Sequence, residues 1–135
     1  MHTIFDDPNK FDTFTPKGFS FRKRVRYETS LMADNGEFVD IYVDFYDDYV
    51  LVTEESYWLE YLECSGVDID FSLAYQKKLT KYAESLGCEL QYRIFIYVKK
   101  EDKTEDQFQD EIYKACYKVA NTSLKLIDKV IKKKR

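Results

Sequence analysis

Residues 38–53 read FVDIYVDFYDDYVLVT, and this stretch decides the fold class. In its first half apolar side chains alternate with polar or aromatic ones, which is the pattern of a strand with one buried face. The pair Asp47-Asp48 then supplies turn residues, and residues 49–53 form a short apolar run. The stretch therefore predicts two strands joined by a tight turn. The side chains expected on the buried face of the first strand are Val39, Ile41, Val43 and Phe45.

A preceding strand is predicted over residues 19–31, because the odd positions there are mainly apolar and the even positions mainly polar. Residues 34–36 read DNG and tolerate positive φ, so the two runs should form a hairpin. A three-residue loop over residues 35–37 would set Leu31 opposite Ile41. This register keeps both apolar sets on the same face of the sheet.

The chain after residue 53 changes first to a helical pattern and then back to a strand pattern. Residues 54–64 carry apolar side chains at helical spacing, with Thr53 as a candidate N-cap. Residues 72–86 repeat that spacing and end before a glycine, which is typical of a helix C-terminus. Residues 88–98 return to a period of two and predict a fourth strand.

A long C-terminal helix is predicted over residues 105–134. Thr104 and Gln107 have the spacing of a capping box at its start, and apolar side chains form one stripe along it. The length of this stripe leaves a homodimer through the helix as an option. The expected fold is α+β, an antiparallel sheet of about four strands in the order β-β-β-α-α-β-α with helices packed on one face.

At 135 residues the chain has room for one compact domain. Residues 1–17 are polar and contain both prolines, which predicts an irregular N-terminal arm ahead of a single α+β domain over residues 18–135. No run approaches the roughly 20 apolar residues of a membrane span. A cytoplasmic location is therefore expected, and a residue usage rich in Lys, Ile, Tyr, Phe, Asp and Glu favours a bacterial host cell.

Catalysis is the function that the sequence favours least. The only histidine is His2, and the three cysteines lie 24 and 28 residues apart, so no zinc site or histidine-based triad is expected. Asp40 and Asp44 lie four residues apart on one predicted strand, about 13 Å, so they cannot share one Mg²⁺ ion. The sequence therefore predicts no enzyme activity, no metal and no cofactor.

Three short segments carry a family resemblance. Residues 48–55 read DYVLVTEE, residues 65–68 read SGVD, and residues 86–88 read LGC ahead of the long helix. They resemble a bacterial and phage domain family of unknown function, the one numbered eighteen-twenty-eight, over roughly residues 15–130. In that family the strand ends in a Thr/Ser-Asp-x-Gly-like turn, where this chain has EES at residues 54–56. The resemblance implies a phage or mobile-element context and brings no catalytic residues.

The net charge of -4 conceals a strong segregation of charge along the chain. Residues 27–76 carry 13 acidic side chains and no basic one, whereas residues 77–135 carry 15 basic and 9 acidic ones. In the simplest interpretation the acidic block is a solvated surface that pairs within the fold with arginines and lysines of the flanking segments. In the functional interpretation some of its carboxylates remain unpaired and meet a basic partner.

Tyrosines interleave with the carboxylates of this block, which predicts an acidic, tyrosine-rich face that docks on a basic protein surface. Carboxylates that mimic phosphates are one way to block a nucleic-acid enzyme. We therefore expect a non-catalytic binding protein, an anti-CRISPR-like inhibitor from a phage or mobile element that acts on a nucleic-acid-dependent bacterial defence protein. The candidate partner-binding residues are Asp40, Tyr42, Asp44, Tyr46, Asp47, Asp48, Glu54 and Glu55.

The basic segments favour a different partner, and the alternative function is a small nucleic-acid-binding protein. Arginines alternate along the first strand, and Phe95 and Tyr97 are placed to lie on the same side of the sheet, where aromatic rings beside cations bind single strands. The C-terminal helix ends in lysines that suit phosphate contacts. The candidate residues for this function are Arg22, Arg24, Arg26, Lys132, Lys133 and Lys134.

Overall fold

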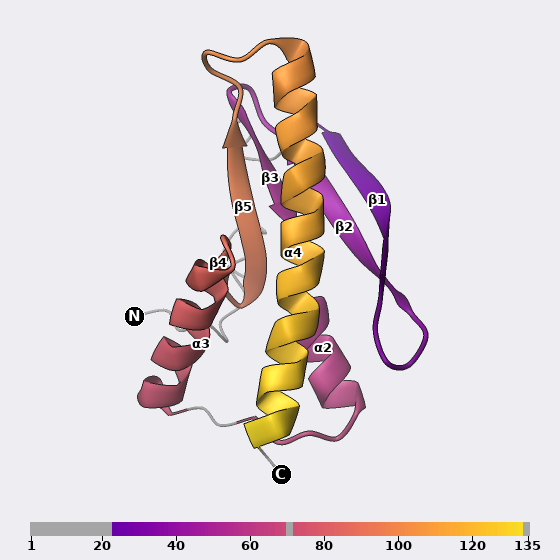
Figure 1. Cartoon of the computed structure of the whole chain (residues 1–135), viewed down its shortest axis with the longest axis vertical. Helices are drawn as coiled ribbons and strands as arrows, with labels where there is room; N and C mark the ends of the chain where they lie inside the picture. The colour runs from indigo at the N-terminus through magenta and orange to yellow at the C-terminus, as the bar shows by residue number, and fades with distance from the viewer. Residues whose placement is uncertain (1–22, 70–71, 134–135) are drawn as a thin grey trace.

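The computed structural model describes residues 23–69 and 72–133, and these residues form the expected α+β fold (Figure 1). Five antiparallel strands make one sheet in the order β1-β2-β3-β5-β4. The strands are β1 (Lys23–Met32), β2 (Phe38–Phe45), β3 (Tyr49–Thr53), β4 (Glu89–Gln91) and β5 (Arg93–Lys99). The helices of the described residues are α2 (Tyr57–Cys64), α3 (Leu73–Ser85) and α4 (Glu105–Lys133). The arm expected over residues 1–17 lies outside the described residues.

The long helix α4 crosses one face of the sheet, which we call the inner face (Figure 1). Its buried residues recur at helical spacing as far as Val130, which is 1% exposed, so the apolar stripe is covered within the chain along its length. This packing explains the stripe without a second copy, and the homodimer stays a prediction. Among the described residues, none of the helices has the length and apolar character needed to cross a bilayer.

The core lies between the inner face of the sheet and the helices. Val43 pairs with Val52, and Val50 pairs with Val98, so each pair points its side chains to the same side of the sheet. The fully buried Trp58 of α2 completes this layer. The other residues that are buried completely in this core are Val39, Ile41, Leu62, Leu79, Ala83, Ile94, Val119, Ala120 and Leu126.

The hairpin of β1 and β2 forms where it was expected, but the predicted register is wrong. Ile41 lies opposite Tyr27, not Leu31, and the strands end with Met32 opposite Phe38. An irregularity between Glu28 and Met32 causes the shift. In every pair the two residue numbers still add up to an even value, so odd-numbered residues of β1 lie opposite odd-numbered residues of β2. The apolar sets of the two strands therefore still share one face.

The strand predicted over residues 88–98 is two strands. The chain reverses at Tyr92, which has a positive φ of 59°, so that Leu90 lies opposite Ile94. Both of these side chains point to the inner face, and the period of two therefore continues through the reversal. The sequence pattern does not reveal this turn, because apolar and polar side chains keep the same alternation before and after Tyr92.

Two of the three predicted helix starts are confirmed. Ser72 accepts a hydrogen bond from the backbone N–H of Tyr75 at the start of α3. Thr104 and Gln107 make both bonds of the capping box ahead of α4. The prediction of Thr53 as the N-cap of α2 is wrong, because its hydroxyl donates to the carbonyl of Ile94 and α2 begins at Tyr57.

Candidate functional site

The middle of the outer face, the side of the sheet opposite α4, is neutralised within the chain. The Arg24 guanidinium binds both carboxylate oxygens of Asp44, with Nε–Oδ1 at 2.6 Å and Nη2–Oδ2 at 2.8 Å. Glu55 Oε1 accepts from Arg24 at 3.1 Å and from Arg93 at 2.6 Å. The hydrogen bond to Asp44 is the main reason that the pKa of Arg24 is raised.

This pairing corrects the prediction that Asp44 contacts a partner, because Asp44 is 1% exposed and its charge is already balanced. Glu55 is partly exposed, but it is shared between two arginines. Tyr42 lies beneath the same arginine, with the Arg24 guanidinium carbon 5.0 Å from the ring centre. The three residues therefore serve an internal ionic network at the centre of the outer face.

Replacing Arg24 with methionine should lower the free energy of unfolding by about 2 kcal/mol, because Asp44 would keep a buried charge without its main partner. The expected loss is smaller than for a fully buried pair because the Arg24 side chain is 31% exposed. Asp44→Asn should cost less, since Arg24 still reaches water. Urea denaturation at pH 7 measures both changes, and a larger loss for Asp44→Asn would contradict this account.

Glu54 is 2% exposed, which corrects its assignment as a docking residue. Its Oε1 atom accepts from the backbone N–H groups of Ser56 at 2.9 Å and Ile94 at 2.8 Å, and Oε2 accepts from Trp58 at 3.0 Å. The carboxyl group therefore caps α2 and ties it to β5. Burial raises the pKa of Glu54 to about 7, against the opposing effect of these hydrogen bonds.

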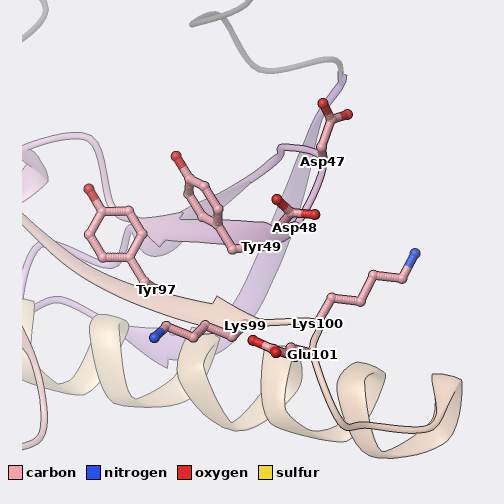
Figure 2. A pocket seen from close by; sticks show the side chains of 7 residues that line it. All are labelled: Asp47, Asp48, Tyr49, Tyr97, Lys99, Lys100 and Glu101. Carbon is pink, nitrogen blue, oxygen red and sulfur yellow. The ribbon is translucent and has the colours of Figure 1, made fainter.

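Asp47 and Asp48 lie at the turn between β2 and β3, at the end of the sheet where β5 leads into α4 (Figure 2). They border a hollow of about 810 Å³ together with Lys99, Lys100 and Glu101. Figure 2 shows the rings of Tyr49 and Tyr97 side by side on the side of the sheet away from α4. Because Lys99 and Lys100 lie beside these carboxylates, the turn is a site of mixed charge and not an acidic patch.

Aromatic rings continue from this turn across the outer face. Tyr46 stacks on Tyr49 with ring centres 4.7 Å apart, and Tyr97 contacts Tyr49 and Phe95 edge-on, both at 5.4 Å. Burial is the main cause of the raised pKa of Tyr46. Successive cross-strand pairs lead from Arg24 on β1 to Tyr97 on β5, and paired residues point to the same side of a sheet. The aromatic rings and the arginines therefore share one face, as expected.

A group of acidic and apolar side chains, some exposed and some half-buried, lies at the opposite end of β2. We call this region the hairpin–α2 surface, and it consists of Met32, Asp34, Glu37, Phe38, Tyr57, Glu60 and Tyr61. Met32 and Phe38 are direct cross-strand neighbours, and they are 49% and 43% exposed. Met32, Asp34 and Tyr61 also line a hollow of about 260 Å³ against α4.

Tyr57 links the hairpin to α2 within this surface. Its pKa is raised to about 12, first by burial and then by the negative charge of Glu37, and Asp40 contributes in the same direction. The Tyr57 and Tyr61 rings lie 6.0 Å apart. The Tyr57 hydroxyl is buried and has no hydrogen-bond partner among the described residues. Of the predicted partner-binding residues only Asp40 borders this surface, and it pairs with Arg26 at 2.8 Å.

The described residues among those predicted for nucleic-acid binding do not form one site in the structure. Arg24 and Arg26 each pair with a carboxylate, so the expectation of a basic strand face is wrong for the described part of β1. Lys132 pairs with Asp128 at 2.8 Å, and the Lys133 ammonium lies 3.7 Å from the ring centre of Tyr75. Two further candidates, Arg22 and Lys134, lie outside the described residues.

Comparisons with family models, with curated proteins and with solved structures find no match for this chain. The resemblance to the family numbered eighteen-twenty-eight therefore stays a prediction. Within residues 23–69 and 72–133, no group of three His, Cys, Asp or Glu side chains is placed to hold a metal ion.

Proposed function

We propose that this protein is a non-catalytic binding protein that docks through the hairpin–α2 surface onto a basic surface of another protein. One observation carries the proposal. The apolar pair of Met32 and Phe38 stays exposed beside carboxylates, although the chain has a complete core elsewhere. Apolar anchors beside a charged rim are the arrangement of a protein interface.

Each part of the surface has a distinct physical role in docking. Complete burial of an exposed apolar side chain is worth about 1.5–3 kcal/mol, so burial of the 49% of Met32 and the 43% of Phe38 that are still exposed makes this pair the main source of affinity. Tyr57 and Tyr61 add rigid contact area with few rotatable bonds. Carboxylates such as Glu37 and Glu60 attract a basic partner over distance and favour it over acidic ones.

The partner that fits best is a nucleic-acid-dependent bacterial protein, such as a CRISPR effector. The basic surface of such a protein is built to hold phosphates, and clustered carboxylates present negative charge to the same lysines and arginines. A chain of this kind would act as an inhibitor from a phage or mobile element. It would compete with nucleic acid and carry out no chemistry of its own.

The double variant Phe38→Ser with Glu60→Gln should lose at least tenfold in affinity for such a partner, because it removes an apolar anchor and a rim charge. Biolayer interferometry with purified CRISPR effectors as probes measures the affinity. A competition assay then measures whether wild type displaces the effector's labelled nucleic acid and whether the variant has lost this ability.

Tyr117→Ala with Glu105→Gln is the matched control, because Tyr117 is 51% exposed on α4 and Glu105 is exposed at its start. The control should bind as tightly as wild type. Equal affinity of the docking variant and wild type would overturn the assignment of the surface. Failure of wild type to bind any effector in the panel would overturn the choice of partner class.

A further inference from the structure

Lysines dominate the exposed surfaces of α3 and of the second half of α4. Residues 73–85 and 114–133 together contain nine lysines and only two acidic residues, Glu84 and Asp128. One of these acids is already paired, since Asp128 binds Lys132 at 2.8 Å. The region is therefore strongly positive in a protein whose net charge is negative.

Contacts between the two helices place several of these lysines on one side of the molecule. The Lys129 ammonium lies 4.4 Å from the ring centre of Tyr82, and Lys118 passes close to Gly87 after the end of α3. Helix α3 therefore runs antiparallel to α4, beside the stripe of α4 that contains Lys118 and Lys129 (Figure 1). Lys125 lies on this stripe because it is seven residues after Lys118 and four before Lys129.

The flank of α3 that adjoins this stripe also carries lysines. Lys78 is three residues after Tyr75 and four before Tyr82, the two rings that contact α4, and Lys81 is three residues after Lys78. We call this set the lysine band, and it consists of Lys78, Lys81, Lys118, Lys125 and Lys129. Within the described part of the chain, none of the five forms an ion pair with a carboxylate.

We propose that the lysine band binds the phosphodiester backbone of nucleic acid without sequence preference. The part of α4 from Lys118 to Lys129 is about 16 Å long at 1.5 Å per residue. A nucleic-acid strand of that length presents about five phosphates at 3.4 Å each. Lysine ammonium groups are point charges that contact phosphates but read no bases, so they supply affinity and not specificity.

An anionic membrane and an acidic protein surface fit the band less well than nucleic acid does. A membrane-binding helix needs a large apolar face beside its cations, whereas within residues 73–85 and 114–133 the exposed large hydrophobic residues are only Leu73 and Tyr117. Protein interfaces are depleted in lysine and enriched in aromatic residues and arginine at their centres. The lysine band has the opposite composition. This proposal is independent of docking through the hairpin–α2 surface, which lies on other elements.

Fluorescence anisotropy with a labelled 20-base-pair DNA duplex, from 50 to 200 mM NaCl, tests the proposal on the full chain. If four phosphates are neutralised, the slope of log Kobs against log salt should be about −3.6. The variant Lys81→Gln with Lys125→Gln should bind about tenfold more weakly at 50 mM NaCl, and its slope should be smaller in magnitude by about 2. A second variant, Lys78→Gln with Lys118→Gln, should show a similar loss.

The matched control is Lys99→Gln with Lys100→Gln, which removes the same charge from exposed residues at the far end of β5. It should bind DNA within about twofold of wild type. An absence of binding at 50 mM NaCl, or an equal loss in control and band variants, would overturn the proposal. Tighter binding to phosphatidylserine vesicles or to polyglutamate than to DNA would overturn it as well.

Discussion

Replacing Glu54 with alanine should lower the free energy of unfolding by about 3–6 kcal/mol, because three buried backbone N–H groups would lose their acceptor. The total stability of a domain of this size is only about 5–15 kcal/mol, so the variant should be largely unfolded or close to it. Urea denaturation followed by circular dichroism measures the loss at pH 6, where the carboxyl group of the wild type is mainly neutral.

The neighbouring Glu55 provides the control for this substitution. Its carboxylate is 25% exposed and binds side chains that also reach water, so Glu55→Ala should cost about 1 kcal/mol or less. The two variants remove the same group from adjacent positions. If they lost the same stability, the hydrogen bonds of Glu54 would not be the reason for its effect.

The stability of the protein should also fall as the pH rises from about 4.5 to about 7, and Glu54 should be the cause. Its pKa is raised from an ordinary value of 4.5 to about 7, so the folded protein holds this proton more tightly than the unfolded chain does. The resulting stabilisation is complete below pH 4.5 and is lost as the pH rises through the folded pKa. The expected fall is about 3 kcal/mol.

Glu54→Gln isolates this effect, because glutamine keeps an acceptor oxygen for two of the N–H groups and has no charge to gain. The stability of the wild type minus that of the variant should decrease by about 3 kcal/mol between pH 4.5 and pH 8. Contributions from all other titrating groups cancel in this difference. A difference that does not change with pH would show that Glu54 ionises as easily in the folded protein as in the unfolded one.

Local patterns predicted the fold class well, because the periodicity and capping residues of a strand or helix can be recognised within a few consecutive residues. The period of two located β1 and β2, a short apolar run located β3, and the helical pattern from residue 72 and the capping box at Thr104 located two helix starts. The missed features depend on contacts between distant segments. The reversal at Tyr92 is stabilised by the Trp58 indole, which donates to the Tyr92 carbonyl from 34 residues away.

The candidate site was predicted less well, for the same physical reason. The sequence does not show which group a carboxylate will bind in the fold. Asp44 and Glu54 were therefore predicted to be surface residues, although both are buried. Arg24 lies 20 residues from Asp44 along the chain, and Ile94, one of the three hydrogen-bond partners of Glu54, lies 40 residues from it. Nothing in the sequence marks Met32 and Phe38 as candidate site residues, because the exposure of an apolar side chain beside a hairpin loop depends on the packing around it.

The two outermost strands of the sheet have a consequence for how this protein associates. β4 is only three residues long, and β1 is interrupted by its irregularity between Glu28 and Met32. Short, bulged or charged edge strands are poor templates for the addition of another strand. Within residues 23–69 and 72–133 the sheet ends at β1 and β4, and this geometry disfavours edge-to-edge aggregation. A partner would accordingly meet this protein through side chains and not through main-chain hydrogen bonds.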